Sequence, residues 1–315
     1  KNKTANINFI VHKTYTNATG SDTLTDGQFQ FQLEPMTDKA PMPQGTQDGK
    51  FTAPSSAGGR TAFPNITYNT EDQGKTFVYK VSEVVPDGAV NGKLAGTTYD
   101  MNAYYIRVTV SGTGSAVNAD IKYYTDEKCK QEVPEDQMYT IENEHRLWVH
   151  NSYTAEPATV IIKGSKTLNG RDMAANEFGF TLEGADPATR NAMTDGSIQE
   201  AQTGTLTASA PAAANNKAGD FTFPEMTFNH VGTYTFKVTE NIPQDAQNNK
   251  LNGVTYDTNV ATVTVLVTDK DANGNKTGQL NATVSYENSK HQSTDLAQFV
   301  NEYAESGSAK IEGTK

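Results

Sequence analysis

Cysteine is almost absent from this chain, because Cys129 is the single one among 315 residues. One thiol can form neither a disulfide within the chain nor the thiolate cage of a structural zinc site. Long apolar runs are absent too, since no stretch approaches the roughly 18 consecutive apolar residues that a membrane-spanning helix needs. We therefore expect no membrane insertion by this sequence, and a stabilising device other than disulfides.

Basic residues are also few and scattered. Lys and Arg number 26 against 37 Asp and Glu, which gives a formal net charge of -11. Because no basic stripe is available to neutralise phosphates, nucleic acid and anionic membrane surfaces are not expected partners. The five histidines show neither metal-ligand spacing nor a Ser–His–Asp pattern. The sequence therefore predicts no metal site and no cofactor.

The ordered-looking segments are short and alternate apolar with polar residues. Thr, Val, Tyr and Phe dominate them, and Gly, Asn, Asp and Pro separate them, which is typical of an all-β protein. Only Pro187–Met193 has a helical pattern. The candidate strands include Asn6–Lys13, Lys75–Glu83 and Arg146–Tyr153 in the first half of the chain and Thr159–Lys166, Gly232–Glu240 and Ala297–Tyr303 in the second.

The two halves of the sequence are copies of each other. FQFQLE at 29–34 recurs as FGFTLE at 178–183, and LAGTTYD at 94–100 recurs as LNGVTYD at 251–257. The matches keep their order, so they indicate a duplication with loop insertions. The sequence therefore predicts two domains, residues 1–155 and 156–305.

The last residues resemble the start of the second domain. SAKIEGTK at 308–315 ends in Gly-Thr-Lys, where the second domain opens with Gly-Ser-Lys at 164–166. We expect residues 306–315 to be a linker and the beginning of a third repeat. A tail without structure is the alternative.

Three polar residues in each repeat continue an apolar stripe that faces the core. Side chains alternate across a strand, so residues of one parity share a face. The stripe Val160, Ile162 and Gly164, for example, leads to a lysine, and matching stripes end in a glutamate and an asparagine. The residues are Lys13, Glu83 and Asn151 in the first repeat and Lys166, Glu240 and Asn301 in the second.

These residue types fit a condensation. Burial favours the neutral amine of lysine and the protonated acid of glutamate. A neutral amine can attack the asparagine carboxamide while the acid polarises it and transfers protons to the departing ammonia. The product is a Lys–Asn isopeptide bond with glutamate as the catalytic residue. A salt bridge at a strand end is the competing interpretation, and Asn143 competes with Asn151 as the acceptor in the first repeat.

Motifs of the second repeat resemble a known family. KTLNGRDMAANEFGFTL at 166–182, YTFKVTE at 234–240, GVTYD at 253–257 and FVNEY at 299–303 are similar to the pilin isopeptide-linkage domain of Gram-positive surface proteins. The resemblance implies two tandem Ig-like β-sandwiches of the CnaB type (reversed immunoglobulin). It also implies that Lys166 and Asn301 form the bond with Glu240 as catalyst, and by position Lys13, Asn151 and Glu83 in the more divergent first repeat.

The function implied is structural. We expect a stalk or shaft segment of a cell-wall-anchored adhesin or pilus outside the bacterial cell, with neighbouring repeats and other pilus subunits as partners. It is not a turnover enzyme, because the one reaction consumes its own residues. The alternatives are a module that binds host protein or glycan through the long segments Met36–Arg60 and Gly184–Gly219, and a spacer in a secreted hydrolase.

Overall fold

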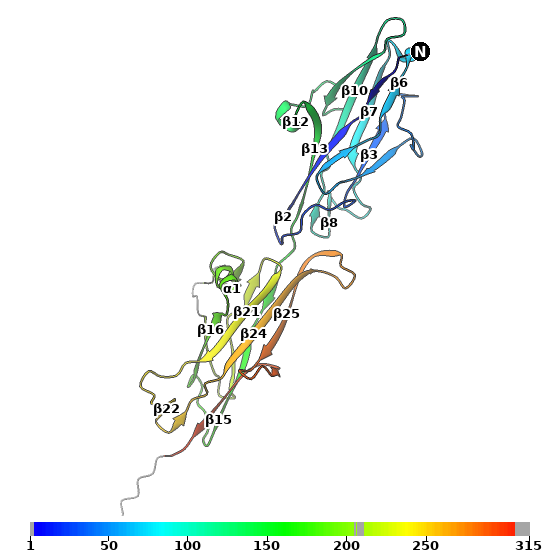
Figure 1. Ribbon diagram of the computed structural model, residues 1–315. Helices are drawn as coiled ribbons and strands as arrows, with labels where there is room; N and C mark the ends of the chain where they lie inside the picture. Colours follow the sequence, from blue (N-terminus) through cyan, green and yellow to red (C-terminus); the bar gives the residue numbers. More distant parts are fainter. Residues whose placement is uncertain (1–2, 205, 207–210, 306–315) are drawn as a thin grey trace, which may run out of the picture. The chain divides into compact units, whose positions relative to one another are not determined.

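The chain folds into two compact units, Lys1–Thr154 and Ala155–Lys315. The computed structural model describes residues 3–204, 206 and 211–305, and each unit is built almost entirely of strands (Figure 1). Residues 306–315, which the sequence predicts to begin a third repeat, lie outside the described residues. Over the described part of the chain, no helix is long and apolar enough to cross a membrane.

The first unit has two main sheets. One sheet has the order β5-β2-β13-β9-β8, with β12 also paired to β13, and the other has the order β11-β10-β7-β3-β4, while β1 and β6 form a separate pair. The strands are β1 Ala5–Ile7, β2 Ile10–Asn17, β3 Gln30–Pro35, β4 Phe51–Pro54, β5 Arg60–Ala62, β6 Ile66–Tyr68, β7 Thr76–Glu83, β8 Lys93–Leu94, β9 Thr97–Thr98, β10 Ala103–Ser111, β11 Asn118–Tyr124, β12 Met138–Ile141 and β13 Glu144–Tyr153, and the 3-10 turns are η1 Thr70–Asp72 and η2 Glu135–Gln137.

The second unit repeats this plan. Its main sheets have the orders β19-β15-β27-β23-β22 and β18-β16-β21-β24-β25-β26, and a small sheet has the order β14-β20-β17. The elements are β14 Ala158–Val160, β15 Lys163–Asn169, β16 Gly179–Gly184, α1 Pro187–Ala192, β17 Ile198–Glu200, β18 Ala212–Ala214, β19 Asp220–Thr222, β20 Met226–Phe228, β21 Gly232–Glu240, β22 Lys250–Leu251, β23 Val254–Thr255, β24 Val260–Lys270, β25 Lys276–Glu287, β26 Ser293–Thr294 and β27 Ala297–Tyr303.

Alternation along the strands builds the core of each unit. The odd-numbered residues of β7 from Phe77 onward are buried, and the intervening ones are more exposed. In the second unit, the Phe180 ring of one main sheet stacks on Phe221 of the other, with ring centroids 3.7 Å apart. The two main sheets therefore pack face to face on aromatic side chains. The predicted all-β class with tandem domains and the helical turn at α1 are confirmed.

Two features of the strand prediction are wrong. Asn6–Lys13 is not one strand, because β1 pairs with β6 while β2 pairs with β13 and β5. The chain thus leaves one sheet and enters another, and the predicted strand Thr159–Lys166 divides in the same way into β14 and β15. The long segment Met36–Arg60, in which no strand is predicted, contains β4, which pairs with β3.

The strand pairing that positions the candidate site joins the two ends of each unit. β2 pairs in parallel with β13, and β15 pairs in parallel with β27. Figure 1 shows β2 and β13 side by side in the first unit. Parallel neighbours need a long connection, and here nearly the whole domain lies between them. Residues from opposite ends of each repeat are therefore adjacent.

Candidate functional site

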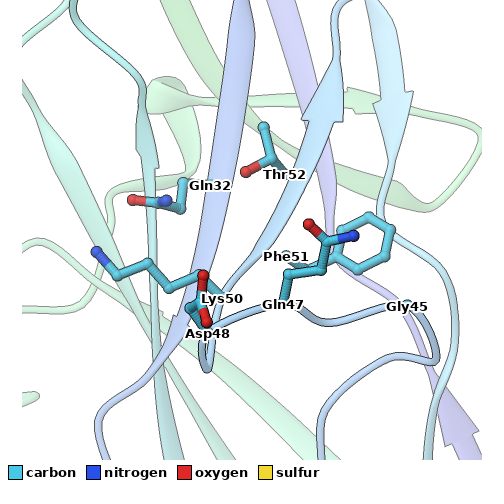
Figure 2. Close-up of a pocket in the computed structure, with 7 residues that line it drawn as sticks. All are labelled: Gln32, Gly45, Gln47, Asp48, Lys50, Phe51 and Thr52. Atoms are coloured by element: carbon cyan, nitrogen blue, oxygen red, sulfur yellow. The ribbon is translucent and has the colours of Figure 1, made fainter.

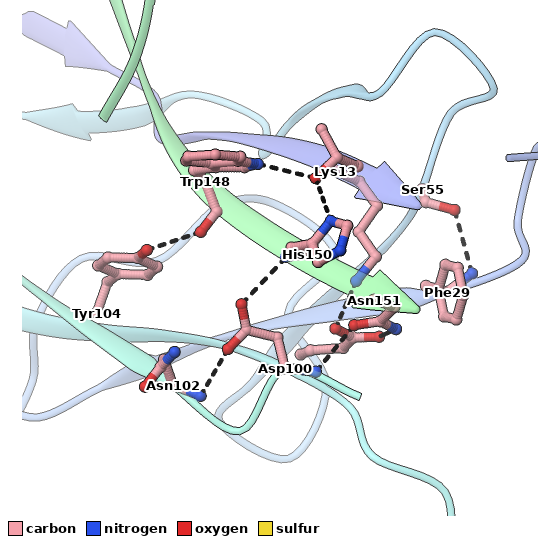
Figure 3. Close-up of polar contacts among 11 residues, drawn as sticks. Lys13, Phe29, Ser55, Asp100, Asn102, Tyr104, Trp148, His150 and Asn151 are labelled. Carbon is pink, nitrogen blue, oxygen red and sulfur yellow. Dashed lines mark hydrogen bonds and ion pairs between the residues drawn. The ribbon is translucent and has the colours of Figure 1, made fainter. Parts of the chain in front are cut away.

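In the first unit, Lys13, Glu83 and Asn151 meet inside the core. The Nζ of Lys13 donates to Oε2 of Glu83 at 2.7 Å, and Nδ2 of Asn151 donates to Oε1 of the same carboxylate at 2.6 Å. The exposed fractions are 2%, 7% and 0% for lysine, glutamate and asparagine. One carboxylate therefore bridges the amine and the carboxamide in a site closed to solvent. Figure 3 shows Lys13 and Asn151 in this site.

The second unit has the same arrangement. Nζ of Lys166 lies 3.0 Å from both carboxylate oxygens of Glu240, and Nδ2 of Asn301 donates to Oε1 of Glu240 at 2.8 Å. These three residues are 2%, 6% and 0% exposed. All six residues singled out in the sequence are thus buried, and each repeat brings its own three together.

Strand register places the lysine and asparagine on one face of the same sheet. Lys13 on β2 lies opposite Val149 on β13, and Asn151 follows two residues later. Because side chains alternate, Val149 and Asn151 point to the same face. In the second unit, Lys166 on β15 lies opposite Phe299 on β27, two residues before its asparagine. The glutamates come from β7 and β21 in the facing sheet.

Burial shifts the protonation equilibria of both charged partners. Loss of solvation lowers the pKa of the Lys13 and Lys166 ammonium groups, and the neighbouring glutamates oppose part of this shift. The same loss raises the pKa of Glu83 and Glu240, which the lysines and asparagines counteract. Both directions favour transfer of a proton from lysine to glutamate. The neutral amine and protonated acid are the forms that a condensation with a carboxamide needs.

An aromatic ring covers each lysine. Nζ of Lys13 lies 4.5 Å from the ring centroid of Phe29, and Nζ of Lys166 lies 4.9 Å from that of Phe178. Both rings are buried. The rings shield the amine from water. Among the described side chains, glutamate is the one that accepts a hydrogen bond from each lysine.

A glycine that the sequence patterns did not single out lies against the backbone of each lysine. Gly59 has φ +83°, and a Cβ there would lie 2.6 Å from the carbonyl oxygen of Lys13. Gly219 has φ +99°, with the corresponding distance to Lys166 at 2.1 Å. Each glycine carbonyl also accepts a hydrogen bond from the lysine amide. Only glycine fits this approach and this left-handed backbone, and its recurrence in both copies was the available signal.

An aspartate was missed as well. Asp100 and Asp257 end the repeated TYD motif, and the backbone N–H of each donates to Oδ1 of the asparagine in its own unit. The distances are 2.8 Å to Asn151 and 2.7 Å to Asn301. The carboxamide is therefore held at both ends, its oxygen by a backbone amide and its nitrogen by glutamate. The repeated motif can be seen in the sequence, but its aspartate does not continue an apolar stripe, so the pattern did not identify it as part of a site.

The rival acceptor in the first unit lies elsewhere. Asn143 lies in the turn between β12 and β13, where it has φ +69° and an exposed side chain. Asparagine tolerates this left-handed conformation better than most residues. The turn accounts for Asn143, and Asn151 is the asparagine that contacts Glu83.

The hollow beside the long segment Met36–Arg60 is not the aromatic groove that binding through this segment would favour. Figure 2 shows this hollow of about 410 Å³ beside β3 and β4, lined by Gln32, Gly45, Gln47, Asp48, Lys50, Phe51 and Thr52. Phe51 is the one aromatic residue among these. Part of the segment Met36–Arg60 thus lines a polar hollow rather than an aromatic groove.

Comparison with known proteins assigns a family. Residues 9–146 and 162–304 each match FctA, the Spy0128-like isopeptide containing domain. No curated protein matches the chain. Among solved structures, the major pilin of Streptococcus pyogenes is 15% identical, with 94% of this chain and 98% of that chain covered and a TM-score of 0.32.

Two further structures are similar at the same low level. The T-13 major pilin of Streptococcus pyogenes is 18% identical over 95% of this chain and 97% of that chain, with a TM-score of 0.29. The shaft pilin SpaA of Lactobacillus rhamnosus GG, a D295N mutant, is 12% identical over 96% and 99%, with a TM-score of 0.22. These scores are too low to carry an argument, so the assignment depends on the two domain matches. Since those matches span most of the sequence, the chain belongs to the family of Spy0128-like isopeptide-containing domains, with one copy in each unit.

Proposed function

We propose that each unit forms its own isopeptide bond, Lys13 to Asn151 in the first and Lys166 to Asn301 in the second, promoted by Glu83 and Glu240. The observation that carries the proposal is the buried carboxylate that bridges amine and carboxamide in both repeats. Contact in a closed core supplies the proximity that a sluggish condensation requires. The membership of both units in an isopeptide-containing family supports it.

The reaction balances within the site. Lysine first gives a proton to glutamate, and the neutral Nζ then attacks Cγ of the asparagine. A C–N bond forms to Nζ while the bond from Cγ to Nδ2 breaks. The acid first protonates Nδ2, which leaves as ammonia, and the resulting carboxylate then takes up the proton that Nζ sheds. That last proton leaves with the ammonia as ammonium. Glutamate ends as it began, and the lysine and asparagine are consumed, so the chemistry occurs once per domain.

The bond suits a load-bearing role. Each link joins the first and last long strands of a unit, so tension applied along the chain passes through the link rather than through the core. The motifs of the second unit resemble the pilin isopeptide-linkage domain, and both units match the isopeptide-containing family. We therefore assign the chain to the shaft or stalk of a pilus or adhesin anchored to the bacterial cell wall, with neighbouring repeats and pilus subunits as its partners.

Intact-mass measurement tests the proposal. The purified chain is expected to be lighter than its sequence mass by two ammonias, and Glu83→Ala and Glu240→Ala are each expected to restore one. Glu225→Ala is the matched control, because Glu225 is exposed and belongs to neither site. A wild-type mass equal to the sequence mass would refute the proposal for both units.

A further inference from the structure

We propose that Asp100 and Asp257 are positioning residues for the cross-link: each carboxylate holds its loop so that the loop's own N–H polarises the carboxamide of the acceptor asparagine. This inference depends on the proposed function and names residues that neither the apolar stripes nor the bridging glutamate identify. Its basis is a set of three hydrogen bonds that recurs in both units.

In the first unit, Asp100 joins three pieces of backbone. Its own N–H donates to Oδ1 of Asn151 at 2.8 Å. Its carboxylate accepts from the amide of Asn102 at 2.9 Å and from the amide of His150 at 3.1 Å. His150 directly precedes the acceptor on β13 (Figure 3). The side chain thus ties the loop to the strand that carries the reacting group.

The second unit repeats each bond with a different sequence around it. The N–H of Asp257 donates to Oδ1 of Asn301 at 2.7 Å. Its carboxylate accepts from the amides of Asn259 at 2.8 Å and Val300 at 2.7 Å. The residue before the acceptor is histidine in one repeat and valine in the other. Because the aspartate bonds only to backbone amides there, this variation leaves the arrangement intact.

The backbone N–H is directed at the oxygen on which charge develops. When the lysine amine attacks Cγ, the carboxamide oxygen gains negative charge, and a fixed donor in a dry site stabilises it. Fixing the oxygen also fixes the opposite end of the carboxamide. Nδ2 of Asn151 and of Asn301 consequently points at the glutamate that must protonate it.

A carboxylate is the side chain that this position requires. It accepts one hydrogen bond on each oxygen, and both donors here are backbone amides. An asparagine offers one acceptor oxygen and would direct an NH₂ group at the other amide. Alanine offers neither. Asp257→Asn therefore removes one of the two hydrogen bonds to backbone amides, and Asp257→Ala removes both.

The test follows ammonia loss from the full chain during cell-free synthesis, with the first unit as the internal reference. Digestion and mass spectrometry give the linked fraction of each unit over time. Losing an oxyanion donor costs about 10²-fold in rate, so we expect Asp257→Ala to slow the second bond by up to about that factor, Asp257→Asn to slow it less, and the first bond to keep its wild-type rate. Asp257→Ala at the wild-type rate would overturn the inference.

A matched control separates positioning from general loss of structure. The side chain of Asn259 bonds the backbone of Gln298 and of Ser289 and touches no reacting group. Asn259→Ala is expected to leave the rate of the second bond near wild type, and a slowing equal to that of Asp257→Ala would contradict us. Wild-type chain that loses no ammonia would instead refute the proposed function itself, so the two failures are distinct.

The pH profile provides a second readout. The Asp257 charge raises the pKa of both Lys166 and Glu240. Asp257→Asn removes that charge, so both pKa values fall and the pH range in which the amine is neutral and the acid protonated moves downward. We expect the rate profile of the second bond to shift to lower pH. A slower reaction with an unshifted profile would reduce Asp257 to a purely structural residue.

Discussion

The two units share the interior of the site and differ at its edges. In both, one carboxylate joins an amine to a carboxamide, and an aspartate amide holds the carboxamide oxygen. Around this, the side chains change. The carbonyl of Trp148 accepts from the Tyr104 hydroxyl at 2.7 Å, whereas the corresponding carbonyl of Gln298 accepts from Nδ2 of Asn259 at 3.0 Å.

A second difference lies along the strand that carries the acceptor. β12 pairs with β13 in the first unit, whereas the described partners of β27 are β15 and β23. The added strand pairs with Glu144–Leu147 of β13, before the acceptor Asn151. Strand register and backbone amides therefore fix the reacting atoms in both units, while the exposed side chains around them differ. Variants can therefore test the shared interior and the variable edges separately.

Loss of an acceptor should have the largest effect. Asn151→Ala and Asn301→Ala each remove one link, and the linked residues are 138 and 135 positions apart. By analogy with a disulfide closing a loop of about 100 residues, each variant is expected to lose up to about 5 kcal/mol of stability in its own unit. Calorimetry should show one transition shifted down and the other in place. A single variant that shifts both transitions would show that the units are not independent.

Ser55 and Asn215 hold the backbone of the rings that cover the two lysines, and their removal should cost the two units a medium and unequal amount of stability. The amide of Phe29 donates to Oγ of Ser55 at 3.1 Å, and that of Phe178 donates to Oδ1 of Asn215 at 2.7 Å. Asn215 also donates to two backbone carbonyls at 2.8 Å. Ser55→Ala is expected to cost about 1 kcal/mol and Asn215→Ala about 2–3 kcal/mol.

Both substitutions should be measured by calorimetry in a chain that lacks the two links, so that the links do not mask the difference. Equal losses in the two units would contradict the account, because Asn215 makes more hydrogen bonds than Ser55.

The smallest effect is expected at the variable edge. Asn143→Gly replaces a residue at φ +69° by one that adopts this conformation freely. We expect unchanged ammonia loss and a change in stability within about 0.5 kcal/mol, as for other surface positions. Intact mass and a melting curve measure both. Retention of one ammonia by this variant would make Asn143 the acceptor of the first unit.

The sequence predicted the all-β class and the residues that lie buried together in each unit, but it missed part of the strand pairing and of the surrounding loop. Alternation identified Lys13, Glu83 and Asn151 because each is a polar residue that continues the core-facing side of an apolar stripe. Alternation could not reveal Asp100, because this residue lies on a loop outside every apolar stripe and its carboxylate accepts from the backbone amides of Asn102 and His150. Nor could it divide Asn6–Lys13 into β1 and β2, since both pieces keep one parity while they pair with different sheets.

In the proposed function, each unit links its own lysine to its own asparagine. Protease digestion of the intact chain followed by tandem mass spectrometry tests it directly. We predict two branched peptides, one joining Lys13 to Asn151 and one joining Lys166 to Asn301, each lighter by one ammonia than the sum of its two arms. Recovery of the same segments only as separate linear peptides of full mass would contradict the account.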